Sequence, residues 1–72
     1  MNMYYKKGTT VIHIKTQRKE TVVGLCKMKI NGNWVDGVIY EGLDYNTDMP
    51  TTFVKSKEEF DNEFILSDWY GN

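Results

Sequence analysis

Hydrophobic and polar residues alternate along the first half of the chain, which predicts β-strands rather than helices. Segment 9–15 alternates first, a polar connection follows at 16–19, and alternation resumes over 20–30. In the first strand Ile12 and Ile14 share one expected face. In the second, the face expected to be apolar consists of Val22, Gly24, Cys26, Met28 and Ile30. The lysines on its other face predict that this strand leaves the core at its far end.

A tight turn is predicted directly after the second strand, at Asn31-Gly32. Both residue types tolerate the positive φ that a type I′ turn requires, so the chain should reverse there as a hairpin. The return strand is expected at about 33–41, and Gly37 within it is expected to form a bulge or a sharp bend.

The second half of the chain predicts a surface loop, a further strand and one short helix. Residues 42–50 are rich in turn-forming types, and 51–55 are β-prone. Ser56 followed by Glu59 fits a capping box, so a helix is expected near 57–64, with Phe60 and Phe64 on one of its faces. Residues 65–70 are expected to supply a last strand.

These elements predict a mainly β fold: a small, strongly bent antiparallel sheet or an SH3-like barrel with one short helix near residues 57–64. A chain of 72 residues can build only one compact core, so we expect a single domain over 1–72 with its core at about 4–70. Ten aromatic residues argue against disorder.

Compartment and membrane contact follow from composition. Cys26 is the only cysteine, so no intramolecular disulfide can form, which favours a cytoplasmic location. Polar residues interrupt the apolar positions after the N-terminus, so no signal peptide is expected. No window reaches the roughly 20 apolar residues that a membrane span needs, so no membrane partner is expected.

Four segments together carry a resemblance to a known group of proteins. These segments are Gly8-Thr9-Thr10-Val11-Ile12-His13, Val22-Val23-Gly24-Leu25-Cys26, Trp34-Val35-Asp36-Gly37-Val38-Ile39-Tyr40, and Phe53-Val54-Lys55 with Phe60 five residues later. Over roughly residues 5–66 the chain resembles short bacterial and tailed-phage proteins of unknown function with an SH3-like barrel. The resemblance implies that fold and brings no catalytic residues; the acidic loop 41–48 is longer than it implies, and the extension 65–72 lies outside it.

Charge is divided unevenly between the two halves of the chain. Residues 1–33 hold seven lysines and arginines against one acid, whereas 34–72 hold two against nine. Three interpretations stay open: ion pairs between the halves across the sheet, a phosphate-binding stripe on the basic half, or a protein contact made by the acidic segments 41–48 or 58–68.

Reactive residues are few, and the sequence predicts no enzyme, cofactor or metal site. His13, Cys26 and Asp36 form the only possible nucleophilic set, and each falls on a different expected strand. Cys26 is expected as a packed core thiol and His13 as a solvated or hydrogen-bonded side chain. Asp44, Asn46 and Asp48 mimic the start of a calcium loop, but Met49 and Lys55 occupy the places of its required glycine and glutamate.

The sequence therefore favours a non-enzymatic interaction module, such as a phage-type accessory protein that binds and modulates a host protein. The residues expected to bind this partner are Asp44, Tyr45, Asp48, Glu58, Glu59, Trp69 and Tyr70. The alternative is a nucleic-acid-binding domain that uses Lys6, Lys7, Lys15, Lys27 and Lys29. The aromatics near the termini, Tyr4, Tyr5, Trp69 and Tyr70, either pack together or form an exposed patch that would suit a homodimer.

Overall fold

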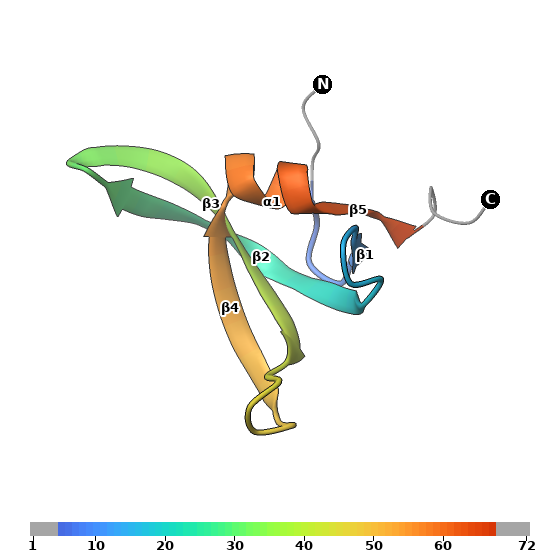
Figure 1. Cartoon of the computed structure of the whole chain (residues 1–72). Helices are drawn as coiled ribbons and strands as arrows, with labels where there is room; N and C mark the ends of the chain where they lie inside the picture. The colour runs from blue at the N-terminus through green and yellow to red at the C-terminus, as the bar shows by residue number, and fades with distance from the viewer. Residues whose placement is uncertain (1–4, 68–72) are drawn as a thin grey trace.

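A five-stranded antiparallel sheet and one short helix make up the computed structural model, which describes residues 5–67 (Figure 1). The elements are β1 (Thr10–His13), β2 (Lys19–Ile30), β3 (Asn33–Leu43), β4 (Pro50–Ser56), α1 (Lys57–Glu63) and β5 (Phe64–Leu66). The strand order in the sheet is β4-β3-β2-β1-β5. The predicted mainly β fold with one short helix is confirmed.

The hairpin predicted at Asn31-Gly32 joins β2 to β3. Asn31 has φ 51° and Gly32 has φ 83°, so both lie in the left-handed region that this turn needs. Ile30 and Asn33 are the last paired residues before the turn. The local sequence therefore sets both the position of the turn and the register of the two longest strands.

A β-bulge in β2 changes which side chains share a face. The register slips between Val22, which lies opposite Tyr40, and Gly24, which lies opposite Ile39. The extra residue reverses the alternation, so Val22 faces the core while Cys26 and Met28 lie on the other face. The expected single apolar face from Val22 to Ile30 was therefore wrong.

The bulge expected at Gly37 is absent: Gly37 lies in regular register opposite Cys26 and Ser56.

The first strand also differs from the expectation. It is shorter, and the two isoleucines that were expected on one face differ in burial. Ile12 is buried, whereas Ile14 lies beyond the end of β1 and is exposed. Val11 enters the core instead.

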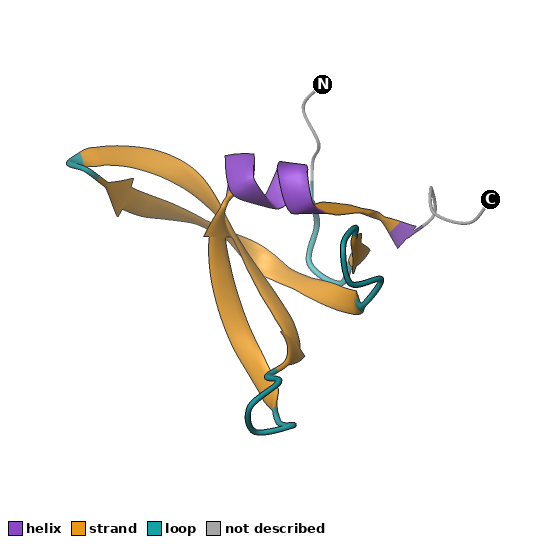
Figure 2. Cartoon of the chain, viewed as in Figure 1, coloured by secondary structure: helices purple, strands orange, loops and turns teal. Residues whose placement is uncertain are grey.

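The helix α1 lies next to β3, β4 and β5 (Figure 2), and a mainly aromatic cluster forms the core. Its buried members are Tyr5, Val11, Val22, Val38, Tyr40, Phe60 and Phe64, with Phe53 and Leu66 packed against them. The Phe60 and Phe64 rings stack with centroids 4.3 Å apart, and Tyr40 meets Phe64 at 5.2 Å. Each such ring pair contributes about 0.5–1.5 kcal/mol beyond the area that it buries.

The predicted cap begins α1 as expected: Ser56 Oγ accepts from the Glu59 amide at 3.2 Å. The helix ends at Glu63, one residue earlier than predicted, and Phe64 opens β5. Phe60 and Phe64 therefore meet across the helix end rather than along one helical face. The last strand, expected at 65–70, covers Phe64–Leu66 within the described residues, and residues 68–70 lie outside the described part of the chain.

The sheet is not closed into a barrel, so of the two predicted alternatives the structure has the open antiparallel sheet. β4 and β5 are its two end strands, and each pairs on one side only within residues 5–67. β5 has three residues, and β4 runs away from it (Figure 1). Edge strands that diverge in this way cannot form the ladder that closure requires.

Two hairpins project from the core as arms, one at the β2–β3 turn and the other at the β3–β4 loop (Figure 1). Most of the large exposed apolar side chains belong to these arms: Leu25, Ile30, Trp34, Leu43, Tyr45, Met49 and Val54. The compact core thus covers its own aromatics and leaves those of the arms in solvent.

Candidate binding site

The β3–β4 loop, residues 44–49, has a defined conformation built around Asp44. The Asp44 carboxylate accepts from the Asn46 amide at 2.8 Å, and the Asp44 amide donates to the Met49 carbonyl at 2.9 Å. The Asp48 amide donates to the Asp44 carbonyl at 2.7 Å, which places Asp48 at φ 61°. One of the predicted partner-binding acids, Asp44, thus shapes the loop, and Asp48 is left exposed at its surface.

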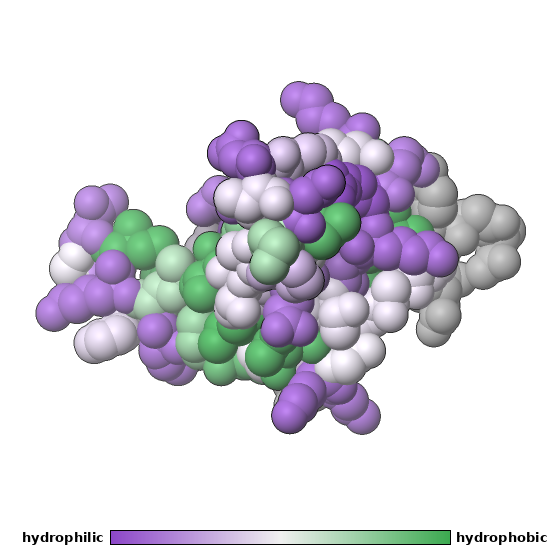
Figure 3. Space-filling model, turned by 90° about the horizontal axis from the view of Figure 1, so that it is seen from below, coloured by the Kyte–Doolittle hydropathy of each residue, from purple (hydrophilic) through white to green (hydrophobic). Residues whose placement is uncertain are grey.

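Two large side chains of this loop are turned into solvent. Tyr45 is 71% exposed and Met49 is 61% exposed, and Leu43, which precedes the loop, is also exposed. Figure 3 looks at the molecule from the side of this loop, and apolar side chains gather in the middle of that view. Such side chains are the type that anchor protein interfaces.

The loop is acidic, and one cation from the body of the protein contacts it. Residues 41–54 contain Glu41, Asp44 and Asp48 and no lysine or arginine. The Arg18 guanidinium, from the β1–β2 connection, lies 4.2 Å from the centroid of the Tyr45 ring. This cation–π contact connects the loop to the body of the protein while the other face of the ring points outward.

The other predicted acidic residues, Glu58 and Glu59, lie at the opposite end of β4. Both are exposed in the first turn of α1. The seven residues of β4 separate them from the loop by about 20 Å at the usual rise per strand residue. The predicted partner-binding residues therefore form two groups rather than one site, and Trp69 and Tyr70 lie outside the described residues.

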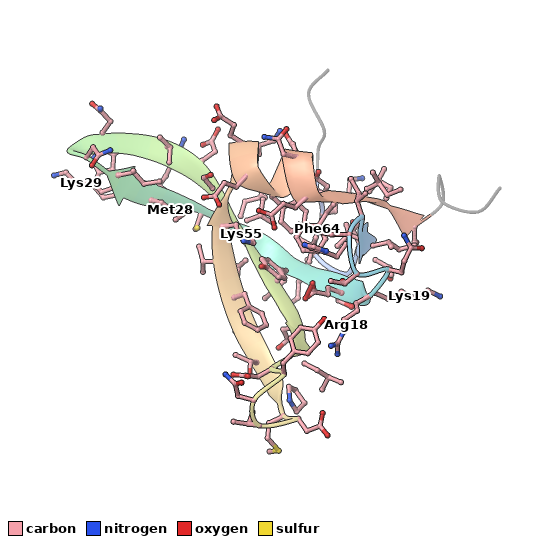
Figure 4. The ribbon with its side chains drawn as sticks, in the orientation of Figure 1. Arg18, Lys19, Met28, Lys29, Lys55 and Phe64 are labelled. Carbon is pink, nitrogen blue, oxygen red and sulfur yellow. The ribbon has the colours of Figure 1, made fainter. Side chains whose placement is uncertain are left out.

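A groove of about 430 Å³ lies on the inner face of the sheet, with its floor on β2 and β3, and it reaches the β3–β4 loop at Tyr45. Phe53 and Lys55 line it from β4, and His13, Glu63 and Phe64 line it from the other side. Lys55 and Phe64 lie toward one another near the middle of the molecule in Figure 4. The groove thus has aromatic and charged walls and lies on the side where the sheet is not closed.

Glu63 holds the charged wall together. Its carboxylate lies 3.3 Å from Lys55 Nζ and 3.4 Å from His13 Nε2, and His13 Nδ1 accepts from the Thr16 amide at 3.2 Å. His13 is therefore hydrogen-bonded, as predicted. The alternation of β1 and β4 puts His13 and Lys55 on this face, but their meeting with Glu63 depends on long-range pairing that the sequence does not reveal.

Two ionisable groups on the floor of the groove have shifted pKa values. Burial raises the pKa of Glu20, although His13 and the nearby cations Arg18 and Lys55 oppose this shift. Burial, with the nearby carboxylates second, raises the pKa of Tyr40 to about 12. Tyr40 therefore stays a neutral hydroxyl on the groove floor through the physiological range.

The lysines of the nucleic-acid alternative do not form one continuous track. Lys29 lies near the end of β2 that is far from Lys19 (Figure 4), Lys15 lies in the β1–β2 connection, and Lys6 and Lys7 precede β1. Lys27 pairs with Asp36 across β2 and β3, and Lys29 Nζ lies 5.6 Å from the centroid of the Trp34 ring. Lys27–Asp36 is the one lysine ion pair within residues 5–67 that joins the basic and acidic halves.

The three reactive residues are not brought together. His13 lies on the inner face of β1, and Asp36 lies on the β2–β3 arm, where the hydrogen bond from Lys27 lowers the pKa of its carboxyl. Cys26 is half-buried on the outer face beside Gly37, rather than in the aromatic core as expected. A cysteine nucleophile would need a base within hydrogen-bond reach, and His13 is on the other side of the sheet.

Residues 5–67 hold no group of three side chains suited to a metal ion. No helix in the same range has the length and apolar character needed to cross a bilayer. Comparisons with protein families, with curated proteins and with solved structures found no match.

Proposed function

We propose that this chain is a non-enzymatic interaction module that binds a protein partner through the tip of the β3–β4 arm. The observation that carries the proposal is the exposure of Tyr45 and Met49 on a loop whose backbone is hydrogen-bonded to Asp44. A preformed loop loses little conformational entropy when it binds, so more of its contact energy contributes to affinity.

The partner surface should combine an apolar pocket with a basic rim. Tyr45 and Met49 would fill the pocket, and Asp48 and Glu41 would face lysines or arginines around it. Central aromatic anchors of this kind often contribute about 2 kcal/mol or more to binding. Charges at the rim mainly raise the association rate and select the partner.

Capture from cell lysate followed by purification of the captured protein tests this proposal. We expect the wild-type chain to retain a protein that the Tyr45→Ser/Met49→Ser variant loses. Trp34→Ser is the matched control, because Trp34 is 67% exposed on the other arm and its loss leaves the β3–β4 tip intact. The captured protein is then produced alone and must bind the wild-type chain directly.

Two results would contradict the proposal. The first is equal recovery of every captured protein by the wild type and the Tyr45→Ser/Met49→Ser variant. The second is loss of the captured protein with Trp34→Ser alone, because this would place the contact on the β2–β3 arm instead. Circular dichroism of each variant confirms that folding is unchanged.

One observation favours the alternative of nucleic-acid binding. The exposed Trp34 ring and Lys29 lie side by side on the β2–β3 arm, and an aromatic next to a cation can stack on a base while contacting its phosphate. This contact predicts a mobility shift with RNA or DNA at low ionic strength that weakens steeply with salt. Absence of any shift would remove the alternative.

The relation to SH3-like phage proteins is part of the proposal. A sheet of order β4-β3-β2-β1-β5, with a short helix between β4 and β5, is the arrangement that an opened SH3-like barrel would have. This order supports the resemblance seen in the sequence, and we propose in addition that the partner is a host protein. Identification of the captured protein tests that step directly.

A further inference from the structure

β4 presents an open edge. All seven of its residues pair with β3, from Gly37 opposite Ser56 to Leu43 opposite Pro50. Within residues 5–67 no strand pairs with its other side, and residues 51–55 make no backbone hydrogen bond outside this ladder. The backbone groups that point away from β3 are therefore available to an incoming strand.

The groove lies beside this same edge. A strand added next to β4 would direct every second side chain into the groove, beside Phe53 and opposite Phe64. The alternate side chains would lie on the outer face beside Val54, which is 48% exposed. Both faces of the added strand would thus meet apolar side chains, so its centre should be β-branched or apolar.

Both ends of the β4 edge are acidic. The loop with Asp44 and Asp48 precedes Pro50, and Glu58 and Glu59 follow Ser56. The two lysines near the second end are already paired: Lys55 lies 3.3 Å from Glu63, and Lys57 lies 2.9 Å from Asp61. A strand that runs along β4 would therefore pass between two sets of exposed carboxylates.

This charge arrangement disfavours a second copy of the chain as the occupant. Two β4 edges related by a twofold axis pair antiparallel, so the acidic loop of one copy would face the acidic helix start of the other. Like charges placed together in this way oppose the pairing, a common protection of edge strands against self-association. The same carboxylates attract a strand with basic ends.

From these features we infer that the free edge of β4 adds an extended segment of the partner protein, with an apolar centre flanked on both sides by lysine or arginine. The inference rests on the proposed function and specifies how the partner binds. It also gives the two separate acidic groups a common role, because one extended segment reaches both of them.

A synthetic peptide provides the test: two lysines, seven alternating threonine and valine residues, and two lysines. It is titrated into the full ¹⁵N-labelled chain and followed by NMR. We expect chemical-shift changes at the backbone amides of residues 51–55. The amides in this segment that face away from β3 should also exchange their hydrogens more slowly. Replacing the four lysines by glutamate should weaken binding at least about tenfold.

Backbone methylation separates strand addition from simple charge attraction. Two further peptides carry N-methyl groups on alternate residues, one on the odd and one on the even positions. Only one set of amides can face β4, so one of these peptides should lose binding at least about tenfold and the other should bind like the parent. Equal binding by all three peptides would overturn strand addition, and so would a parent peptide that leaves residues 51–55 unperturbed at millimolar concentration.

A matched pair of variants checks the role of the acidic ends. Asp48→Asn removes one negative charge at the edge, and Asn33→Lys makes the same change in net charge at the distant hairpin tip. Only Asp48→Asn should weaken the parent peptide. If the peptide does not bind but capture of the partner still depends on Tyr45 and Met49, strand addition is wrong and the proposed function stands. If capture does not depend on Tyr45 and Met49 either, both are wrong.

Discussion

The hydroxyl of Tyr5 donates to the Asp61 carboxylate at 2.7 Å, which joins the segment before β1 to α1 across 56 positions of sequence. The Tyr5 ring is buried and meets the edge of Phe60 at a centroid distance of 4.8 Å. Lys57 also donates to Asp61, at 2.9 Å. This small network fixes the helix above the sheet and completes the aromatic core.

Replacing Tyr5 by Phe should lower the free energy of unfolding by about 1–2 kcal/mol, because the ring stays while the hydrogen bond to a charged group is lost. Urea denaturation measures the change. Tyr45→Phe is the control, and no loss of stability is expected there, since Tyr45 lies in solvent. An unchanged midpoint for Tyr5→Phe would show that the bond contributes nothing.

Stability should fall above pH 10. Burial and the bond to Asp61 raise the pKa of Tyr5, and burial raises the pKa of Tyr40 to about 12. Unfolded tyrosines ionise near pH 10, so the unfolded state releases protons first and is favoured as the pH rises from there. The unfolding free energy, measured between pH 8 and 12, should be flat below 10 and then decline, less steeply in Tyr40→Phe. A wild-type profile that is flat up to pH 12 is the opposite result.

Loss of the helix cap should be measurable by thermal unfolding. Ser56→Ala removes the acceptor of the Glu59 amide and should cost about 1 kcal/mol, whereas Ser56→Asp, which keeps a side-chain acceptor, should cost less. For a domain of this size the alanine variant should melt about 4–8 °C lower. Equal melting temperatures for the wild type and Ser56→Ala would contradict the capping role.

Gly37 lacks room for a side chain on the outer face of the sheet. A Cβ built there would lie 2.7 Å from Met28 Cγ and 2.8 Å from Cys26 Sγ. Gly37→Ala should therefore destabilise the protein by about 1–3 kcal/mol through overpacking. In the double variant Gly37→Ala/Met28→Ala the loss should be smaller than the sum of the two single losses. Additive losses would mean that Met28 does not limit this site.

The sequence predicts the local parts of this fold because their physical causes are local. Asn31-Gly32 adopts the positive φ values of its turn without help from distant residues, and Ser56 caps α1 through a bond to a residue three positions away. The bulge after Val22 is different. One extra residue reverses the alternation of β2, and a period-two pattern contains no sign of it.

The candidate sites also differ in how far the sequence predicts them. The acidic, aromatic loop with Tyr45 and Asp48 can be predicted from composition, because it lies within one short segment. The groove cannot be predicted in this way. Glu63 contacts His13 across 50 positions of sequence, and the sheet stays open beside the groove because its end strands β4 and β5 diverge. Charge counts by halves also fail to show that Asp48 and Glu58 lie at opposite ends of one strand.

Binding of the purified partner to single-residue variants is the most direct measurement of the role proposed for the β3–β4 tip. Calorimetric titration should show Tyr45→Ser binding about 30-fold more weakly than the wild type, as expected for loss of an anchor worth about 2 kcal/mol. Trp34→Ser should bind as the wild type does. An unchanged dissociation constant for Tyr45→Ser would contradict the assignment of the binding surface to this loop.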